Sequence, residues 1–250
     1  MEVSIELLLL FFAVAIVAGA VDAIAGGAGL ITIPTMLAVG VPPAVAVATN
    51  KLGGVAGTLS STLHFVRLGQ IQFRQCVPMA AAAFIGAILG GLMLTWVDAS
   101  FLSTLVPVLL IGFSAYFLFA PKVGELDKQK LISLPLFAGT FAPLVGFYDG
   151  FFGPGTGAFF CLGLVLLLGY NMIKATAHAK LLNLSSNLAA LLFFIWHGTI
   201  LWEIGLAMMA GQFIGGNIGA RVVVHHGTRV IKIVMAVVAC AISAKLMLSD

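Results

Sequence analysis

The chain has 250 residues, of which 61% are hydrophobic and 8% charged, and its formal net charge is +3. A soluble domain carries about 25% charged residues, so this composition excludes a protein with a wholly water-facing surface. The twelve Lys and Arg residues are scattered, with no basic stripe between aromatic residues, which argues against nucleic-acid binding. We therefore expect the lipid bilayer to surround the chain, and no nucleic acid among its partners.

Near-continuous apolar runs predict membrane helices, because lipid tolerates only helices and closed barrels, and barrel strands would alternate polar and apolar residues. The first run is expected to be a retained helix, since Glu2 and Glu6 give it the wrong charge for a signal peptide. In chain order the runs cover residues 5–24, 29–40, 43–67, 75–96 and 99–120, then 131–151, 155–168, 171–196, 202–223 and 229–248.

The second run of each half, 29–40 and 155–168, is too short to cross a bilayer. Its roughly 12–14 residues reach about 18–21 Å, whereas the hydrocarbon layer is about 30 Å thick. A helix of this length is stable at membrane depth only when protein surrounds it. We therefore expect a broken or re-entrant helix in each half.

The chain also contains an internal repeat, which predicts a protein of two related halves. Three segments of the first half, 19–34, 48–61 and 84–91, return in order as 146–161, 177–190 and 213–220. In a chain this apolar, matched halves with glycine-interrupted segments are typical of a secondary transporter with its site at the repeat interface.

The Lys and Arg content of short loops predicts which side of the membrane each loop occupies. The loop with Arg67 and Arg74 is basic, whereas its counterpart at 196–203 has neither Lys nor Arg. The loop 96–99 has neither, whereas its counterpart at 221–232 is basic. Equivalent loops therefore lie on opposite sides, which makes the two repeats inverted.

These patterns predict an all-α polytopic membrane protein of two inverted-topology repeats, each of about five helical segments. The N-terminal repeat covers 1–120, a polar linker 121–130, and the C-terminal repeat 131–250. The expected location is the cell (inner) membrane, with the lysine-containing linker in the cytoplasm. Both termini then face outward, provided that the first two segments of each half return to their starting side. Whether those segments span or re-enter stays open.

Asp22 and Asp149 occupy the same place in each half, directly before a glycine-rich break. A carboxylate at membrane depth costs about 2.5–3.5 kcal/mol, so each needs a reason to be there. One reason is capping of the short helix that follows. The other is proton coupling, in which the carboxylate carries a proton between the two sides. The residues alone leave both readings open.

The breaks themselves predict an anion site. Glycine permits unwound backbone, and the short helix after each break presents free N–H groups and its positive dipole end. No G-x-x-x-x-G-K-[ST] motif is present, which argues against a nucleotide. The candidate substrate-binding residues here are Gly26, Gly27 and Gly29 in the first half, and Gly153, Gly155 and Thr156 in the second.

Lys51 and Lys180 lie at equivalent places inside long apolar helices. A single lysine there could snorkel to the headgroups, but two in inverted halves approach one midplane from opposite sides. Together with nearby amides and two positive helix ends they would hold an oxyanion. The neighbouring candidates are Thr49, Asn50, His178 and Asn183. His178 could also relay protons or be a hydrogen-bonded structural histidine.

The aspartate-to-glycine breaks, with ATNKL at 48–52 and AHAKL at 177–181, resemble the TauE/SafE family, often named sulfite exporters. The segments GFYDGFFGP and KATAHAKLLN are most similar to the YfcA-type branch of that family. The resemblance covers nearly the whole chain. It implies a transporter of small sulfur-containing oxyanions, usually exporting them with the proton gradient. The family's doubled motifs fall on Asp22, Lys51, Asp149 and Lys180 with their glycines.

We therefore expect a secondary transporter of the sulfite and organosulfonate class that works by proton-coupled export and alternating access. The alternatives are an uncoupled anion channel and a carrier of non-sulfur organic anions. An enzyme is not expected, because Ser60, Ser61 and His64 lack the oriented nucleophile, base and oxyanion hole of serine catalysis. No catalytic residue, cofactor or metal is predicted. The expected partners are a small anion and lipid, and the oligomeric state is open between monomer and homodimer.

Overall fold

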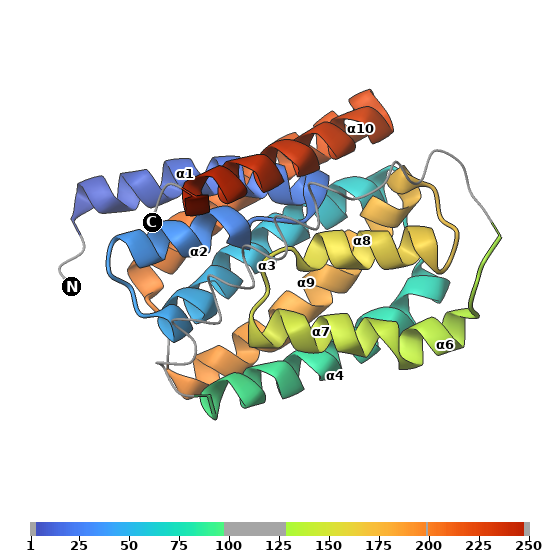
Figure 1. The fold of residues 1–250 in the computed structure, drawn as a ribbon, viewed down its shortest axis with the longest axis horizontal. Coiled ribbons are helices and arrows are strands. Elements are labelled where there is room, and N and C mark those ends of the chain that lie inside the picture. The colour runs from blue at the N-terminus through green and yellow to red at the C-terminus, as the bar shows by residue number, and fades with distance from the viewer. Residues whose placement is uncertain (1–3, 98–128, 199, 248–250) are drawn as a thin grey trace.

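The structure of the chain, a computed structural model, describes residues 4–97, 129–198 and 200–247, with side chains up to residue 226. Every regular element within these ranges is an α-helix, so the predicted all-α class is confirmed (Figure 1). The predicted segment 99–120 and most of the linker 121–130 lie outside the described residues.

The helices of the first half follow the predicted segments closely. They are α1 (Ile5–Ala25), α2 (Gly29–Ala38), α3 (Pro43–Arg67) and α4 (Phe73–Thr95). Ser4 caps α1 by accepting the N–H of Leu7. Gly26 ends α1 with a φ of +80°, a left-handed conformation that favours glycine. The helix α2 has 10 residues, or about 15 Å, which agrees with a helix too short to span.

The second half differs from its prediction at one point. The predicted segment 131–151 is divided into α6 (Leu134–Gly139) and α7 (Phe141–Phe151), with Thr140 outside helical geometry. Pro143 explains the break, because it has no N–H for the carbonyl of Gly139 and its ring crowds that carbonyl. The remaining helices are α8 (Thr156–Leu166), α9 (Met172–His197) and α10 (Trp202–Met247).

The helix α10 joins two predicted segments, 202–223 and 229–248, without a helical break. The basic loop predicted at 221–232 is therefore helical, and the predicted boundary was wrong. A single glycine and no proline mark this stretch, and one glycine costs a helix only about 1 kcal/mol. The ribbon nevertheless turns back at the upper right of Figure 1, so the change of chain direction expected between the two segments is present, although no loop interrupts the helix.

Glycines allow close backbone contact between α1 and α10 and between α4 and α7. A Cβ at Gly215 would overlap the carbonyl oxygen of Ile16, and a Cβ at Gly86 would overlap that of Pro143. The repeat aligns these two pairs with each other. Close approach of this kind drives helix association in lipid, where apolar side chains gain little from each other.

The long central helices α3 and α9 run antiparallel (Figure 1). The backbone N–H of Gln72, just after α3, reaches His178 in the first half of α9. The backbone N–H of Leu201, just after α9, reaches Thr49 in the first half of α3. The end of each helix therefore lies beside the beginning of the other, and the two cross the middle of the molecule in opposite directions.

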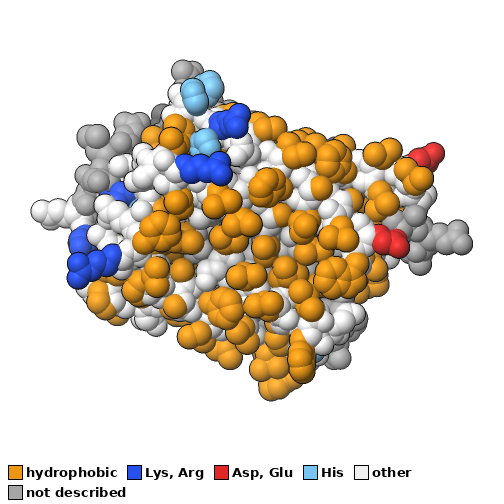
Figure 2. Space-filling model, turned by 180° about the vertical axis from the view of Figure 1, so that it is seen from behind, with side chains coloured by type: hydrophobic (Ala, Val, Ile, Leu, Met, Phe, Trp, Pro, Cys, Tyr) orange, Lys and Arg blue, Asp and Glu red, His pale blue; other side chains and the backbone are white. Residues whose placement is uncertain are grey.

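The outer surface suits a bilayer. Among the described residues, α1, α4 and α9 are long and apolar enough to cross a membrane. Hydrophobic side chains cover most of the face in Figure 2, with Lys, Arg and His at one end and acidic side chains at the other. Trp96, Trp196 and Trp202 are all exposed, as expected for anchors at the lipid–water boundary.

Candidate functional site

Two buried ion pairs connect the halves of the molecule. Lys51 Nζ on α3 donates to Asp149 Oδ1 on α7 at 2.7 Å, and Lys180 Nζ on α9 donates to Asp22 Oδ2 on α1 at 3.0 Å. Each lysine therefore pairs with the aspartate of the opposite half. The four side chains are at most 8% exposed. Two positive and two negative charges bring the net charge of this cluster to zero.

Asp149 is surrounded by side-chain donors. Besides Lys51, its Oδ1 accepts the hydroxyl of Thr156 at 2.8 Å, and its Oδ2 accepts the hydroxyl of Ser186 at 2.6 Å. Thr156 is the first residue of α8, directly after the glycine-rich break. Charge-assisted hydrogen bonds of this kind are about twice as strong as neutral ones, so they fix this carboxylate in place.

Asp22 has fewer hydrogen-bond donors within the described part of the chain. Its Oδ1 accepts the backbone N–H of Ala28 at 3.3 Å, a cap on the break before α2, and Lys180 also donates to its backbone carbonyl. The repeat places Gly29 and Gly57 where the second half has Thr156 and Ser186, so neither hydroxyl has a counterpart near Asp22. The pair Asp22–Lys180 is therefore held by fewer side-chain bonds than the pair Asp149–Lys51.

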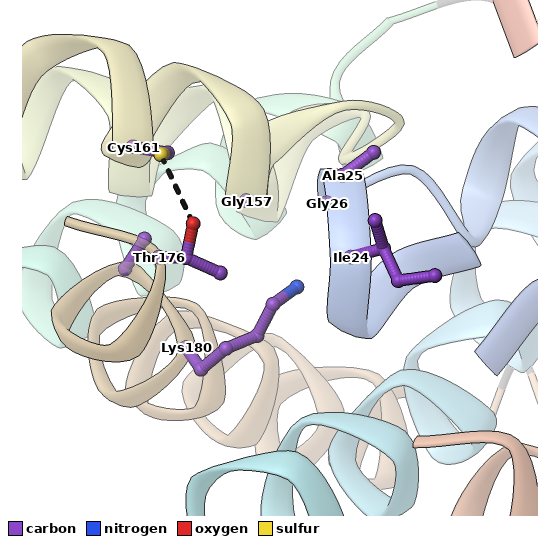
Figure 3. A pocket seen from close by; sticks show the side chains of 8 residues that line it. Ile24, Ala25, Gly26, Gly157, Cys161, Thr176 and Lys180 are labelled. Atoms are coloured by element: carbon purple, nitrogen blue, oxygen red, sulfur yellow. Dashed lines mark hydrogen bonds between the residues drawn. The ribbon is translucent and has the colours of Figure 1, made fainter. Parts of the chain in front are cut away.

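Lys180 reaches its partner across a seam between the two breaks. Figure 3 shows its ammonium directed between Gly157 of α8 and the end of α1 at Ile24 and Gly26. A Cβ at Gly157 would lie 2.7 Å from the Cα of Gly26 and 3.2 Å from the Lys180 nitrogen. Only glycines leave room for this contact, so the breaks of the two halves pack directly on each other.

A small cavity lies beside the ion pairs. It is lined by both aspartates, by glycines of both breaks, and by Asn50, Asn183 and Asn187. Asn50 accepts the hydroxyl of Thr32 at 2.6 Å, and Asn187 donates to Asn183 at 2.9 Å. The cavity therefore offers amide groups next to charges that are already paired.

Most of the residues that the sequence singled out meet here. Asp22, Asp149, Gly26, Gly29, Gly153, Gly155, Asn50 and Asn183 line the cavity, while Lys51, Lys180 and Thr156 bond to the aspartates. Gly27 does not line it. The proposed roles of these residues in binding and in proton coupling stay predictions.

Thr49 and His178 point elsewhere. The Thr49 hydroxyl accepts the N–H of Leu201 at 3.1 Å, and His178 Nε2 accepts the N–H of Gln72 at 3.2 Å. These N–H groups precede α10 and α4, which correspond in the repeat. Thr49 and His178 therefore have equivalent structural roles in the two halves, because each accepts a backbone N–H where the next long helix begins.

Two further residues of this site, Ser186 and Thr32, were not predicted from the sequence. Ser186 lies three residues after Asn183, so helical spacing places it on the face already assigned to the site. That spacing was the available signal. Thr32 lies one turn after Ala28 at the start of α2. It bonds to Asn50 of α3, which lies 18 positions later in the sequence. Nothing in local sequence indicates that contact.

The chemistry available here is exchange of an anion on a buried ammonium. Removing one partner of a buried pair leaves an uncompensated charge, at a cost of about 3–5 kcal/mol. A lysine can therefore leave its carboxylate only if another anion takes that place or a proton neutralises the carboxylate. An oxyanion offers the same kind of acceptor atom as a carboxylate, so it can replace one on the lysine.

Comparisons with known proteins find one family and several close relatives. The family described as sulfite exporter TauE/SafE matches residues 11–246. A probable membrane transporter protein of Haemophilus influenzae is 43% identical over 98% of this chain and 96% of its own length. The probable membrane transporter protein YfcA of Escherichia coli K12 is 44% identical over 98% and 91%. The probable transporter YunE of Bacillus subtilis is 22% identical over 92% and 94%.

Proposed function

The chain belongs to the TauE/SafE family of membrane transporters, and we propose that it carries small sulfur-containing oxyanions out of the cell by proton-coupled alternating access. The observation that carries this proposal is the crossed arrangement of the ion pairs, Lys51 with Asp149 and Lys180 with Asp22. Each half supplies the cation for the anion of the other, so a substrate that enters between them contacts both halves at once.

Proton coupling arises because the Asp22 carboxylate and the substrate oxyanion compete for the ammonium of Lys180. A proton on Asp22 removes its charge, frees the ammonium of Lys180, and lets a substrate oxyanion accept its hydrogen bonds. Proton and anion therefore bind together. A dianion and one proton carry a net charge of −1, and a membrane potential that is negative inside drives this charge outward with about 2.3 kcal/mol per 100 mV. The proton leaves with the anion, so a pH gradient that is alkaline inside opposes export, and the membrane potential supplies the driving force.

The pair Asp22–Lys180 is the one that opens in this scheme. Asp149 is held by two hydroxyls as well as by Lys51, whereas among the described residues Asp22 has only a backbone N–H at 3.3 Å in addition to Lys180. The pair Asp149–Lys51 then stays intact and forms the unchanged side of the site.

The orientation in the membrane is part of the proposal. Antiparallel α3 and α9, and the matched glycine contacts of α1 with α10 and α4 with α7, support two inverted repeats. The end with Lys, Arg and His side chains would face the cytoplasm. The linker 121–130 would lie on that side, and both termini on the outer side of the inner membrane.

The test is anion flux from proteoliposomes that contain the purified protein. Vesicles loaded with sulfite, sulfate, taurine, isethionate or a simple carboxylate are diluted into anion-free buffer, with and without an imposed pH gradient. We expect efflux of a sulfur oxyanion that accelerates when the inside is acid. Lys180→Met should abolish it, and Lys174→Met, on the same helix but with its ammonium over the ring of Tyr170, should not.

Other outcomes identify the alternatives. Flux of a sulfur oxyanion that ignores the pH gradient contradicts proton coupling and indicates a channel. Flux of carboxylates without sulfur oxyanions contradicts the proposed substrate class.

A further inference from the structure

The contact between α3 and α10 contains buried polar side chains without hydrogen-bond partners. Gln212 of α10 is 0% exposed, and within the described residues neither its amide nitrogen nor its amide oxygen has a partner. Ser60 of α3 is 2% exposed, and its hydroxyl is also unpartnered there. Each such group costs about 1–3 kcal/mol, so these residues do not stabilise the helix pair.

These groups lie along one continuous face. Gly53, Gly57, Ser60, His64 and Arg67 are spaced by three or four residues and so line one face of α3. The Gln212 amide lies against the beginning of this face: a Cβ at Gly53 would lie 2.6 Å from its nitrogen, and one at Gly57 would lie 3.1 Å from its oxygen. Gly54, three residues before Gly57 and therefore beside it on the helix surface, lines the cavity next to the ion pairs, so the face begins at the edge of that cavity.

The other end of the face is basic. His64 interacts electrostatically with Arg67, Arg221 and His225, which are all exposed. Figure 2 shows Lys, Arg and His side chains gathered at one end of the molecule, as this cluster requires. A concentration of positive charge raises the local concentration of small anions and their rate of entry.

The second half provides an internal comparison, because α9 packs on α4 as α3 packs on α10. At the places of Gly53, Gly57, Ser60, His64 and Arg67 it has Leu182, Ser186, Ala189, Phe193 and Trp196. Gln212 corresponds to Ala83, and Arg221 to Leu92. Ser186 is the polar residue among these counterparts, and it bonds to Asp149, while Ser185 of α9 donates to the carbonyl of Ala80 on α4. The serines of α9 therefore have partners, whereas Ser60 and Gln212 have none within the described residues, so the polar groups between α3 and α10 need another explanation.

We infer that the α3–α10 seam is the route by which a small oxyanion passes between the ion-pair site and the basic end of the molecule. This inference rests on the proposed function. The amide of Gln212 and the hydroxyl of Ser60 are the hydrogen-bond donors along the route, and His64 with Arg67 and Arg221 forms its mouth. The route is closed in this structure, because Gly216 of α10 lies directly against the carbonyl of Gly57.

Cysteine labelling tests the route without requiring knowledge of the cargo. Ser60→Cys is compared with Ala189→Cys, its counterpart in the second half, after Cys76, Cys161 and Cys240 are replaced by Ala. Inside-out vesicles are treated with an anionic methanethiosulfonate (ethylsulfonate) or a cationic one (trimethylammonium). We expect the anionic reagent to label Ser60→Cys about tenfold faster than the cationic one, with Ala189→Cys unlabelled. Equal protection of both cysteines would overturn the route.

A second variant covers the case in which the cysteine variant fails to fold. Gln212→Leu removes an unpaired amide, so it should raise the unfolding temperature in detergent while slowing flux about tenfold or more. A residue with a purely packing role would change stability and flux in the same direction, and this result would also overturn the route.

The two proposals fail in different ways. Labelling of Ser60→Cys without sulfur-oxyanion flux keeps the route and removes the proposed substrate. Sulfur-oxyanion flux that is unchanged in Gln212→Leu, with Ser60→Cys protected, keeps the function and removes the route.

Discussion

Lys51 Nζ lies 2.7 Å from Asp149 Oδ1 although 98 positions separate the two residues, and this contact joins the two halves at the centre of the molecule. Lys51 is 0% exposed and Asp149 is 1% exposed, so the molecular surface reaches neither charge. This isolation makes the pair a sensitive test of the fold as well as of the site.

Lys51→Met should destabilise the protein by about 3–5 kcal/mol, because it leaves Asp149 as a buried unpaired charge. The double variant Lys51→Met with Asp149→Leu should recover part of that loss, since no uncompensated charge remains. Unfolding in mixed detergent micelles measures both. Simple addition of the two single effects would contradict a direct pair.

Ser186→Ala should cost about 1–3 kcal/mol, because it removes a hydroxyl that donates to a buried carboxylate. Ser185→Ala is the matched control: its hydroxyl donates to the neutral carbonyl of Ala80 at 2.8 Å and is only partly buried. We expect the control to lose less stability in the same unfolding assay. Equal losses would show that the bond to Asp149 has no special strength.

Gly215→Ala and Gly86→Ala should each disrupt folding, since a Cβ at either place overlaps a carbonyl oxygen of the neighbouring helix. Gly139→Ala is the control, because a Cβ there meets nothing within 4 Å. Yield of monodisperse protein on gel filtration measures the effect. Normal yield of Gly215→Ala would mean that α1 and α10 lie further apart than described.

His178→Ala and Thr49→Ala should lower stability by about 1–3 kcal/mol each, because each leaves a backbone N–H without its acceptor. Anion affinity should be unchanged in both, since neither side chain faces the cavity. A thermal-shift titration gives stability and ligand affinity in one experiment, because a ligand that binds the native state stabilises it. Lost affinity at unchanged stability would place these residues in the site.

The sequence was sufficient for the fold class and for most helix boundaries, because apolar runs and glycine breaks are local signals. The segment 43–67 agrees with α3 at both ends. Thr140 and the continuous α10 were missed, since a proline inside an apolar run and a single glycine give weak or misleading signals. The repeat indicated which groups gather at the centre.

The partners within the site could not be predicted. Helical spacing assigns Lys51 and Lys180 to faces, but only the tertiary fold brings Asp149 to Lys51 and Asp22 to Lys180, so that each lysine pairs with the aspartate of the other half. Thr49 lies two positions before Lys51 in sequence yet points to the beginning of α10. Residues two positions apart on a helix point about 200° apart, so proximity in sequence did not indicate a shared cavity.

The most direct test of the account is the number of protons taken up when an anion binds. Calorimetric titration in two buffers of different ionisation enthalpy gives this number, once the anion's own buffering is subtracted. For the sulfur oxyanion that stabilises the protein most, we predict uptake of about one proton per anion bound, and none in Asp22→Asn, which should still bind the anion. Anion binding to the wild-type protein without proton uptake would contradict exchange of the oxyanion for the Asp22 carboxylate on Lys180.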